Sequence, residues 1–164
     1  MSLDGLNLTP DSEVLATIFP DTAKISTTIL SSTIKTCTFI AHLQNLAGET
    51  DEELVVHLEL SSPDEPGTSI TPTVSALQSL AALAIPGLVP FVLEFGTAIA
   101  EDGRTLAYSA TTYFADTVAL DSVWGDLPDS QRGNIASQVS DAMAKIQNID
   151  LRGAKAQAIL RTRV

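Results

Sequence analysis

The side chains best suited to acid–base chemistry in this sequence are two histidines and one nearby carboxylate. His42 and His57 are the only histidines, and Glu59 follows His57 by two positions. If the runs that carry them pair as an antiparallel hairpin around residues 49 and 50, His42 lies opposite His57, and Glu59 shares their face of the sheet. A histidine pair beside a carboxylate can act as acid and base.

Two other interpretations of these residues stay open. Two histidines and a glutamate are also a ligand set that zinc accepts. A one-faced antiparallel sheet, however, carries solvated polar residues without any chemical role, and a slip of one position would separate the histidines. The sequence therefore predicts His42, His57 and Glu59 as candidate catalytic residues, with no metal and no other cofactor.

Three more polar side chains are candidates for contacting a substrate. Tyr108 and Tyr113 share one strand-like run and are five positions apart, so they point to opposite faces, and one hydroxyl can reach a pocket. Packing at the core or its rim is the alternative for both tyrosines. Asp116 is the third candidate, although aspartates in this region also suit helix caps and exposed surface. The sequence contains no Gly-rich phosphate loop and no HExxH helix.

The elements that must position these residues begin with strands. Five runs are rich in β-branched residues or alternate between apolar and polar positions: residues 24–30, 34–43, 54–60, 91–95 and 105–114. In the second run Cys37, Phe39 and Ala41 fall on one face, so Cys37 is expected to be a buried small hydrophobe. The runs predict an antiparallel sheet.

Helices account for the rest of the chain. A short helix is expected after Thr9, a second after Thr71, and a longer one capped by Asp129 or Ser130, while residues 151–164 continue as helix. Trp124 is expected in the core against the sheet. Because strands and helices do not alternate, the sequence predicts an α+β fold, in which a five-stranded antiparallel sheet with a packed helix precedes C-terminal helices. We expect one domain over residues 1–164, made of an N-terminal helix and lead-in (1–22), the sheet with its helix (23–116) and C-terminal helices (117–164).

Charge and composition exclude several partners. The 164 residues carry a net charge of −11, and ten acids but no Lys or Arg lie between Lys35 and Arg104. Nucleic acids and anionic membranes bind basic surfaces, so neither is an expected partner. Cys37 is the only cysteine, which excludes an internal disulfide. The N-terminus lacks the charged-then-apolar order of a signal peptide, so a cytoplasmic location is expected.

The order of elements resembles the small lobe of kinase-like folds. Three segments resemble the aminoglycoside phosphotransferase family, especially its fungal members: residues 85–90 its lead into the fourth strand, residues 113–124 its hinge and next helix, and residues 127–150 the helix before its catalytic loop. The resemblance covers roughly residues 20–150. It implies a kinase-like small lobe.

The sequence differs from that family at the positions that bind phosphate and catalyse its transfer. His57 replaces the basic residue that the family carries on its third strand, and Ala115-Asp116 replaces the hinge glycine. Thr73 or Val74 stands at about the position where the family has an acidic residue on the helix. The catalytic base and the metal-binding aspartate, which would follow Val164, have no counterpart. Phosphoryl transfer depends on these groups, so the resemblance implies a truncated, degenerate lobe that does not transfer phosphate.

The expected function follows from these departures. We expect a non-phosphotransferase relic of a kinase lobe that binds a small, largely apolar molecule and, if it is an enzyme, acts as a cofactor-free cyclase or isomerase of fungal secondary metabolism. The alternatives are a pseudokinase-like protein-interaction module and a fragment of a longer phosphotransferase. Without a large lobe, the apolar faces of the last helices are exposed, and a homodimer would cover them.

Overall fold

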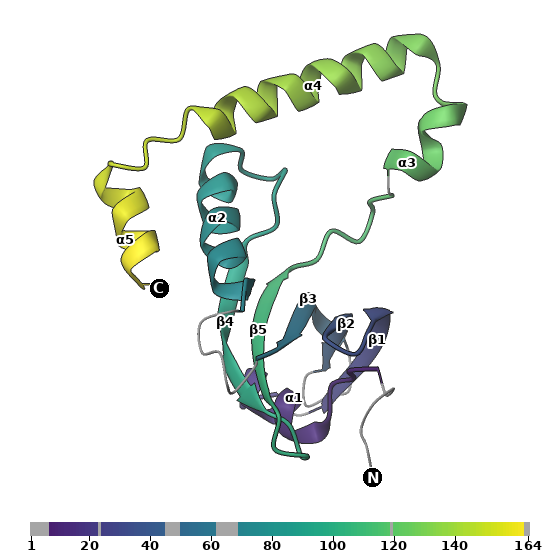
Figure 1. Ribbon diagram of the computed structural model, residues 1–164. Coiled ribbons are helices and arrows are strands. Elements are labelled where there is room, and N and C mark those ends of the chain that lie inside the picture. The colour runs from purple at the N-terminus through teal and green to yellow at the C-terminus, as the bar shows by residue number, and fades with distance from the viewer. Residues whose placement is uncertain (1–6, 23, 45–49, 62–68, 119, 163–164) are drawn as a thin grey trace.

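The computed structural model describes residues 7–22, 24–44, 50–61, 69–118 and 120–162. The five strands within these ranges form one antiparallel sheet in the order β1-β2-β3-β5-β4 (Figure 1). The strands are β1 (Lys24–Ser32), β2 (Thr36–Gln44), β3 (Thr50–Leu60), β4 (Val92–Ile99) and β5 (Thr105–Thr112). The predicted α+β fold with a five-stranded antiparallel sheet is confirmed.

The helices follow the predicted order. They are α1 (Ser12–Ile18), α2 (Thr71–Ala84), α3 (Leu120–Val123), the 3-10 turn η1 (Trp124–Asp126), α4 (Asp129–Gln147) and α5 (Ala154–Thr162). The helix expected over residues 151–164 begins only at Ala154, because turns at residues 148–153 interrupt it. In the described part of the chain, no helix combines the length and the apolar character needed to cross a membrane.

The main core lies on the α1 side of the sheet. Alternate residues of β2 and β3 point into it, so Cys37, Phe39 and Val56 are fully buried there. The helix α1 closes this core with Val14 and Ile18 and packs on β4. The expected burial of Cys37 is confirmed, and its thiol is free.

The opposite face of the sheet is only partly covered. The helix α2 packs against β4 and β5, while the same face of β1, β2 and β3 carries half-buried or exposed polar residues such as Thr38, His42 and His57. A groove can therefore form where α2 stops covering the sheet.

The C-terminal helices lie away from the sheet. No residue of α4 is buried, and α4 crosses above the end of α2 (Figure 1). Trp124, expected in the core, is 39% exposed. Arg132 holds it instead, since its guanidinium lies 6.0 Å from the ring centre and Nε donates to the Trp124 carbonyl at 3.0 Å. The expectation was wrong because the chain after β5 leads away from the sheet, so the apolar stripe that contains Trp124 does not reach it.

Candidate functional site

His42 and His57 share one face of the sheet but do not face each other. The register places His42 opposite Glu53, and His57 opposite Thr38. The predicted pairing of the two histidines was wrong by four positions. The reason is that β3 already begins at Thr50, so the connection from β2 is shorter than expected and the pairing shifts.

Hydrogen bonds occupy both ring nitrogens of His42. Its Nδ1 lies 2.7 Å from Glu53 Oε1, and its Nε2 lies 2.9 Å from Thr28 Oγ1. These contacts join β1, β2 and β3 across the partly exposed face. With both nitrogens bonded, His42 has no ring atom left for a substrate and is best explained as a polar contact of the sheet surface.

His57 keeps one ring nitrogen available. Its Nδ1 lies 3.0 Å from Thr38 Oγ1, whereas Nε2 makes no hydrogen bond with any residue that the structure describes. Burial lowers the pKa of His57 below its usual value, and the nearby Glu59 carboxylate offsets only part of this effect. The imidazole is therefore neutral at pH 7, and a neutral imidazole can take up a proton.

The hydrogen bonds of Glu59 give this side chain a structural role at the start of α2. It accepts hydrogen bonds from Ser69 Oγ and Thr71 Oγ1, both at 2.6 Å, from Thr71 N at 3.0 Å and from Ile70 N at 3.3 Å. Burial alone would raise the pKa of Glu59, but these bonds outweigh burial and lower it. An ionised carboxylate thus occupies the start of α2, which is the kind of position that binds phosphate in other proteins.

The zinc interpretation of these three residues receives no support. Within the described ranges, no three His, Cys, Asp or Glu side chains come together in a way that could hold a metal ion. His42, His57 and Glu59 instead bind three different sets of partners.

A groove lies between α2 and the sheet, with His57 in its wall. Its volume is about 310 Å³. It is lined by Val55, His57, Ile70, Thr71, Val74, Gln78, Ser109 and Thr111. The α2 residues of this lining are Thr71, Val74 and Gln78. Among the described residues of the lining, His57 is the only one that can carry a charge.

Ser109 is the polar residue of this groove that the sequence prediction missed. It lies directly opposite His57 in the β3–β5 ladder, where side chains are about 5 Å apart at Cβ. Its hydroxyl makes no hydrogen bond with a described residue. The other polar groups have partners: Gln78 Nε2 donates to the Pro90 carbonyl at 2.9 Å, and Thr111 Oγ1 to the Val55 carbonyl at 3.3 Å. Only the pairing of β3 with β5 could have revealed Ser109.

The three predicted substrate-binding residues lie outside this groove. Tyr108 points into the opposite core, where it is 5% exposed and donates to Glu94 Oε1 at 2.9 Å. Burial, together with Glu94, raises the pKa of Tyr108 to about 12. Tyr113 and Asp116 follow the end of β5, and neither is among the described residues that line the groove.

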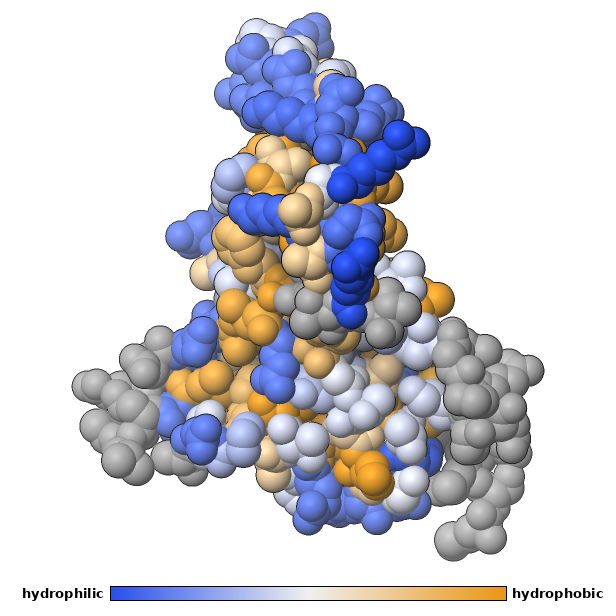
Figure 2. All heavy atoms as spheres, turned by 90° about the vertical axis from the view of Figure 1, so that its left-hand side faces the viewer, coloured by the Kyte–Doolittle hydropathy of each residue, from blue (hydrophilic) through white to orange (hydrophobic). Residues whose placement is uncertain are grey.

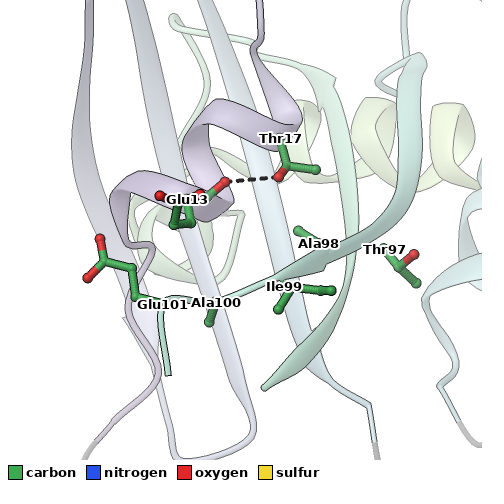
Figure 3. A pocket seen from close by; sticks show the side chains of 7 residues that line it. All are labelled: Glu13, Thr17, Thr97, Ala98, Ile99, Ala100 and Glu101. Carbon is green, nitrogen blue, oxygen red and sulfur yellow. Dashed lines mark hydrogen bonds between the residues drawn. The ribbon is translucent and has the colours of Figure 1, made fainter. Parts of the chain in front are cut away.

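A larger hollow between α1 and β4 lacks the features of a site. It measures about 610 Å³, but the side chains along it do not converge on one point (Figure 3). Its carboxylate Glu101 accepts a hydrogen bond from Ser12 Oγ at 2.5 Å, and its own N–H donates to Asp11 Oδ2 at 2.8 Å. These contacts fasten the first helix to the β4–β5 turn, so we assign the hollow a structural role.

A third hollow, of about 510 Å³, lies where α2 meets α4 and α5. Leu80, Leu83 and Ala156 supply apolar walls, and Lys145 and Lys155 lie at its rim. Figure 2 shows this side of the molecule, with apolar side chains beneath the hydrophilic top that α4 forms. The polar part of this lining consists of two exposed lysines with Asn148 and Asp150, not of a neutral ring nitrogen in an apolar wall, so we take the α2 groove as the better candidate.

Comparisons with known proteins identified no relative of this chain. No family model matches the chain, and no curated protein or solved structure does so either.

Proposed function

We propose that the groove between α2 and the sheet binds a small, largely apolar, uncharged molecule, and that His57 exchanges a proton with it in a cofactor-free isomerisation or cyclisation. The observation that carries this proposal is a neutral His57 with an available Nε2, opposite the unbonded hydroxyl of Ser109, in a groove with mostly apolar walls.

The size and polarity of the groove support a compact ligand. A volume of about 310 Å³ is near the lower end of the range for small-molecule sites, roughly 300–1,000 Å³. Val55, Val74 and Ile70 offer apolar contact, and His57 and Ser109 offer one polar edge. Such a site positions a ligand by shape and orients it with few hydrogen bonds.

The charges around the groove disfavour an anionic ligand. Its described lining contains no Lys or Arg, and Glu59 already occupies the amides at the start of α2. A nucleotide phosphate would therefore meet a carboxylate and no counter-charge. This supports the proposal that the chain, although akin to the small lobe of aminoglycoside phosphotransferases, does not bind nucleotide in the manner of that family.

The relationship to kinase-like small lobes and the biological context are also parts of the proposal. The order of strands and helices, with α2 on the same face as His57, agrees with a kinase-like small lobe. A role in fungal secondary metabolism rests on the resemblance alone. The buried free thiol of Cys37 agrees with a reducing compartment such as the cytoplasm.

The proton transfer can be tested with a neutral reporter, 5-nitrobenzisoxazole. A base removes the proton from its C3 carbon while the ring N–O bond breaks, which releases a coloured cyanophenolate. We expect the protein to accelerate this reaction, and His57→Gln to lower the rate by at least about tenfold. Because the pKa of His57 is lowered, the wild-type rate should rise with pH and reach half of its plateau below pH 6.5, the ordinary pKa of histidine.

Three further variants make the test specific. His42→Gln should keep the rate, because His42 lies outside the groove and has both nitrogens bonded. Ser109→Leu, which fills the groove, should abolish saturation by the reporter, while Thr97→Leu in the hollow beside α1 should not. Equal rates for the wild type and His57→Gln would overturn the assignment of His57 as the base.

One observation favours a second candidate function, that of a protein-interaction module. Val139 and Met143 on α4 are each 51% exposed, and such a module would use an exposed apolar surface of this kind. Titration with ATP and magnesium separates both candidates from a phosphotransferase fragment, since neither proposal predicts nucleotide binding and the fragment requires it.

A further inference from the structure

The helix α4 carries an apolar stripe in which no residue is buried. Apolar residues recur along it at spacings of four, three and four: Ile135, Val139, Ala142 and Ile146. This is the spacing of helices that pair along one seam. Val139 is 51% exposed, and every residue of α4 is at least partly exposed.

The stripe is not the side of α4 that faces the rest of the molecule. The helix meets α2 through the hollow that Ala144, Lys145 and Asn148 line near its C-terminal end. On a helix with 3.6 residues per turn, these positions are centred about 160° away from Val139 and Ile146. The contact with α2 therefore lies on the side of α4 away from the stripe.

Two such stripes that pair antiparallel bring side chains of complementary size together. In an antiparallel pair whose two-fold axis passes between Ser140 and Asp141, Ile135 lies level with Ile146 of the second copy, and Val139 with Ala142 of the second copy. Large residues then meet at both ends of the seam, and a medium-sized residue meets a small one at its centre. A parallel pair would instead place Ala142 against Ala142 and leave a gap.

The charge at the start of α4 favours the same arrangement. Asp129 begins α4 with its side chain 99% exposed. The antiparallel register keeps the two Asp129 carboxylates at opposite ends of the pair. A parallel register would place Asp129 beside Asp129, where the charges repel.

Neighbouring apolar residues extend the surface beyond α4. Leu120 is 42% exposed and Trp124 39% exposed, and the Arg132 contact holds Trp124 at the N-terminal end of the helix. Leu151, 51% exposed, lies past the other end. An antiparallel pair brings the two ends together, so these side chains would add to a seam that is short when made by α4 alone.

We propose that the chain forms a two-fold symmetric homodimer in which α4 pairs antiparallel with α4 of a second copy. Such an interface uses the same patch on both subunits and closes on itself. It lies apart from the α2 groove, so this proposal and the proposed function can fail independently.

Light scattering after size-exclusion chromatography tests the association. The full chain should elute with twice the 17.3 kDa mass of one copy and dissociate on dilution. Val139→Glu should give the monomer mass at the same concentration, while Ser137→Glu, on the opposite side of α4, should remain dimeric. Thermal unfolding followed by circular dichroism checks that both variants fold, because both positions are exposed.

Cysteine crosslinking tests the orientation. In a Cys37→Ser background, the pair Ile135→Cys and Ile146→Cys should form a disulfide-linked dimer on mild oxidation. The two positions are about 16 Å apart along one helix, so they cannot bond within a chain. Ile135→Cys alone should not crosslink. A monomeric wild type, a dimeric Val139→Glu variant, or a crosslink through Ile135→Cys alone would each overturn the proposal.

Discussion

His57 on β3 and Ser109 on β5 lie directly opposite each other in the sheet, and no hydrogen bond joins them. Both residues line the groove under α2. A polar atom of a ligand placed there can bond to both residues. The groove therefore offers one polar edge in an otherwise mostly apolar wall.

The first prediction concerns the hydroxyl of this pair. Ser109→Ala should weaken binding of the neutral probe 2-naphthol about fivefold, since it removes one neutral hydrogen bond of about 1 kcal/mol. Amide chemical shifts recorded during a titration give the dissociation constant. Ser26→Ala, on the exposed part of β1 opposite His42, is the control and should bind as the wild type does. An unchanged constant in Ser109→Ala would argue against a role for this hydroxyl.

The second prediction follows from the separation of the two histidines. Because His42 and His57 have no shared partner, the effects of His42→Ala and His57→Ala on the free energy of unfolding should add within about 0.5 kcal/mol in the double variant. Urea unfolding of the four proteins measures this. A coupling above about 1 kcal/mol would mean that the histidines interact after all.

The third prediction concerns the carboxylate that caps α2. Glu59→Gln should destabilise the protein by about 1 kcal/mol at pH 7, as the loss of a helix cap does. Since folding lowers the pKa of Glu59, its contribution is present above the unfolded value near 4.5 and is lost as the pH falls through the folded value. The variant should therefore lose less stability on acidification than the wild type.

Glu52→Gln is the matched control for that experiment. Glu52 is exposed on the same strand, so its stability should stay within about 0.5 kcal/mol of the wild type. If Glu59→Gln and Glu52→Gln unfold at the same urea concentration at pH 7, the capping role assigned to Glu59 is wrong.

The fourth prediction concerns the contact of Gly96 with Tyr108. A Cβ atom at position 96 would lie 3.3 Å from the Tyr108 ring, which burial and the bond to Glu94 hold in place. Gly96→Ala should therefore cost roughly 1–3 kcal/mol of stability. Gly133→Ala, inside α4 with no atom within 4 Å of the new methyl, should keep or raise stability. Chemical denaturation compares the two, and equal stability would show that Tyr108 can move aside.

The alternation of residue types in the sequence was sufficient to predict the strands and the side of the sheet that is buried. Cys37, Phe39 and Ala41 recur every second position and share the core, because successive side chains of a strand point to opposite faces. The same rule placed His42, His57 and Glu59 together on the other face. These properties are local, so a single segment of sequence contains them.

Only the tertiary structure decided which of these residues meet. The register of β2 against β3 depends on where the connection closes, and alternation is unchanged when a strand shifts by an even number of positions; this is why His42 was paired with the wrong partner. The groove combines β3, α2 and β5, and Ser109 entered it through a strand pairing 52 positions from His57. Burial of Tyr108 and exposure of Trp124 were decided in the same way, because packing between distant segments, not residue type, determines what covers a side chain.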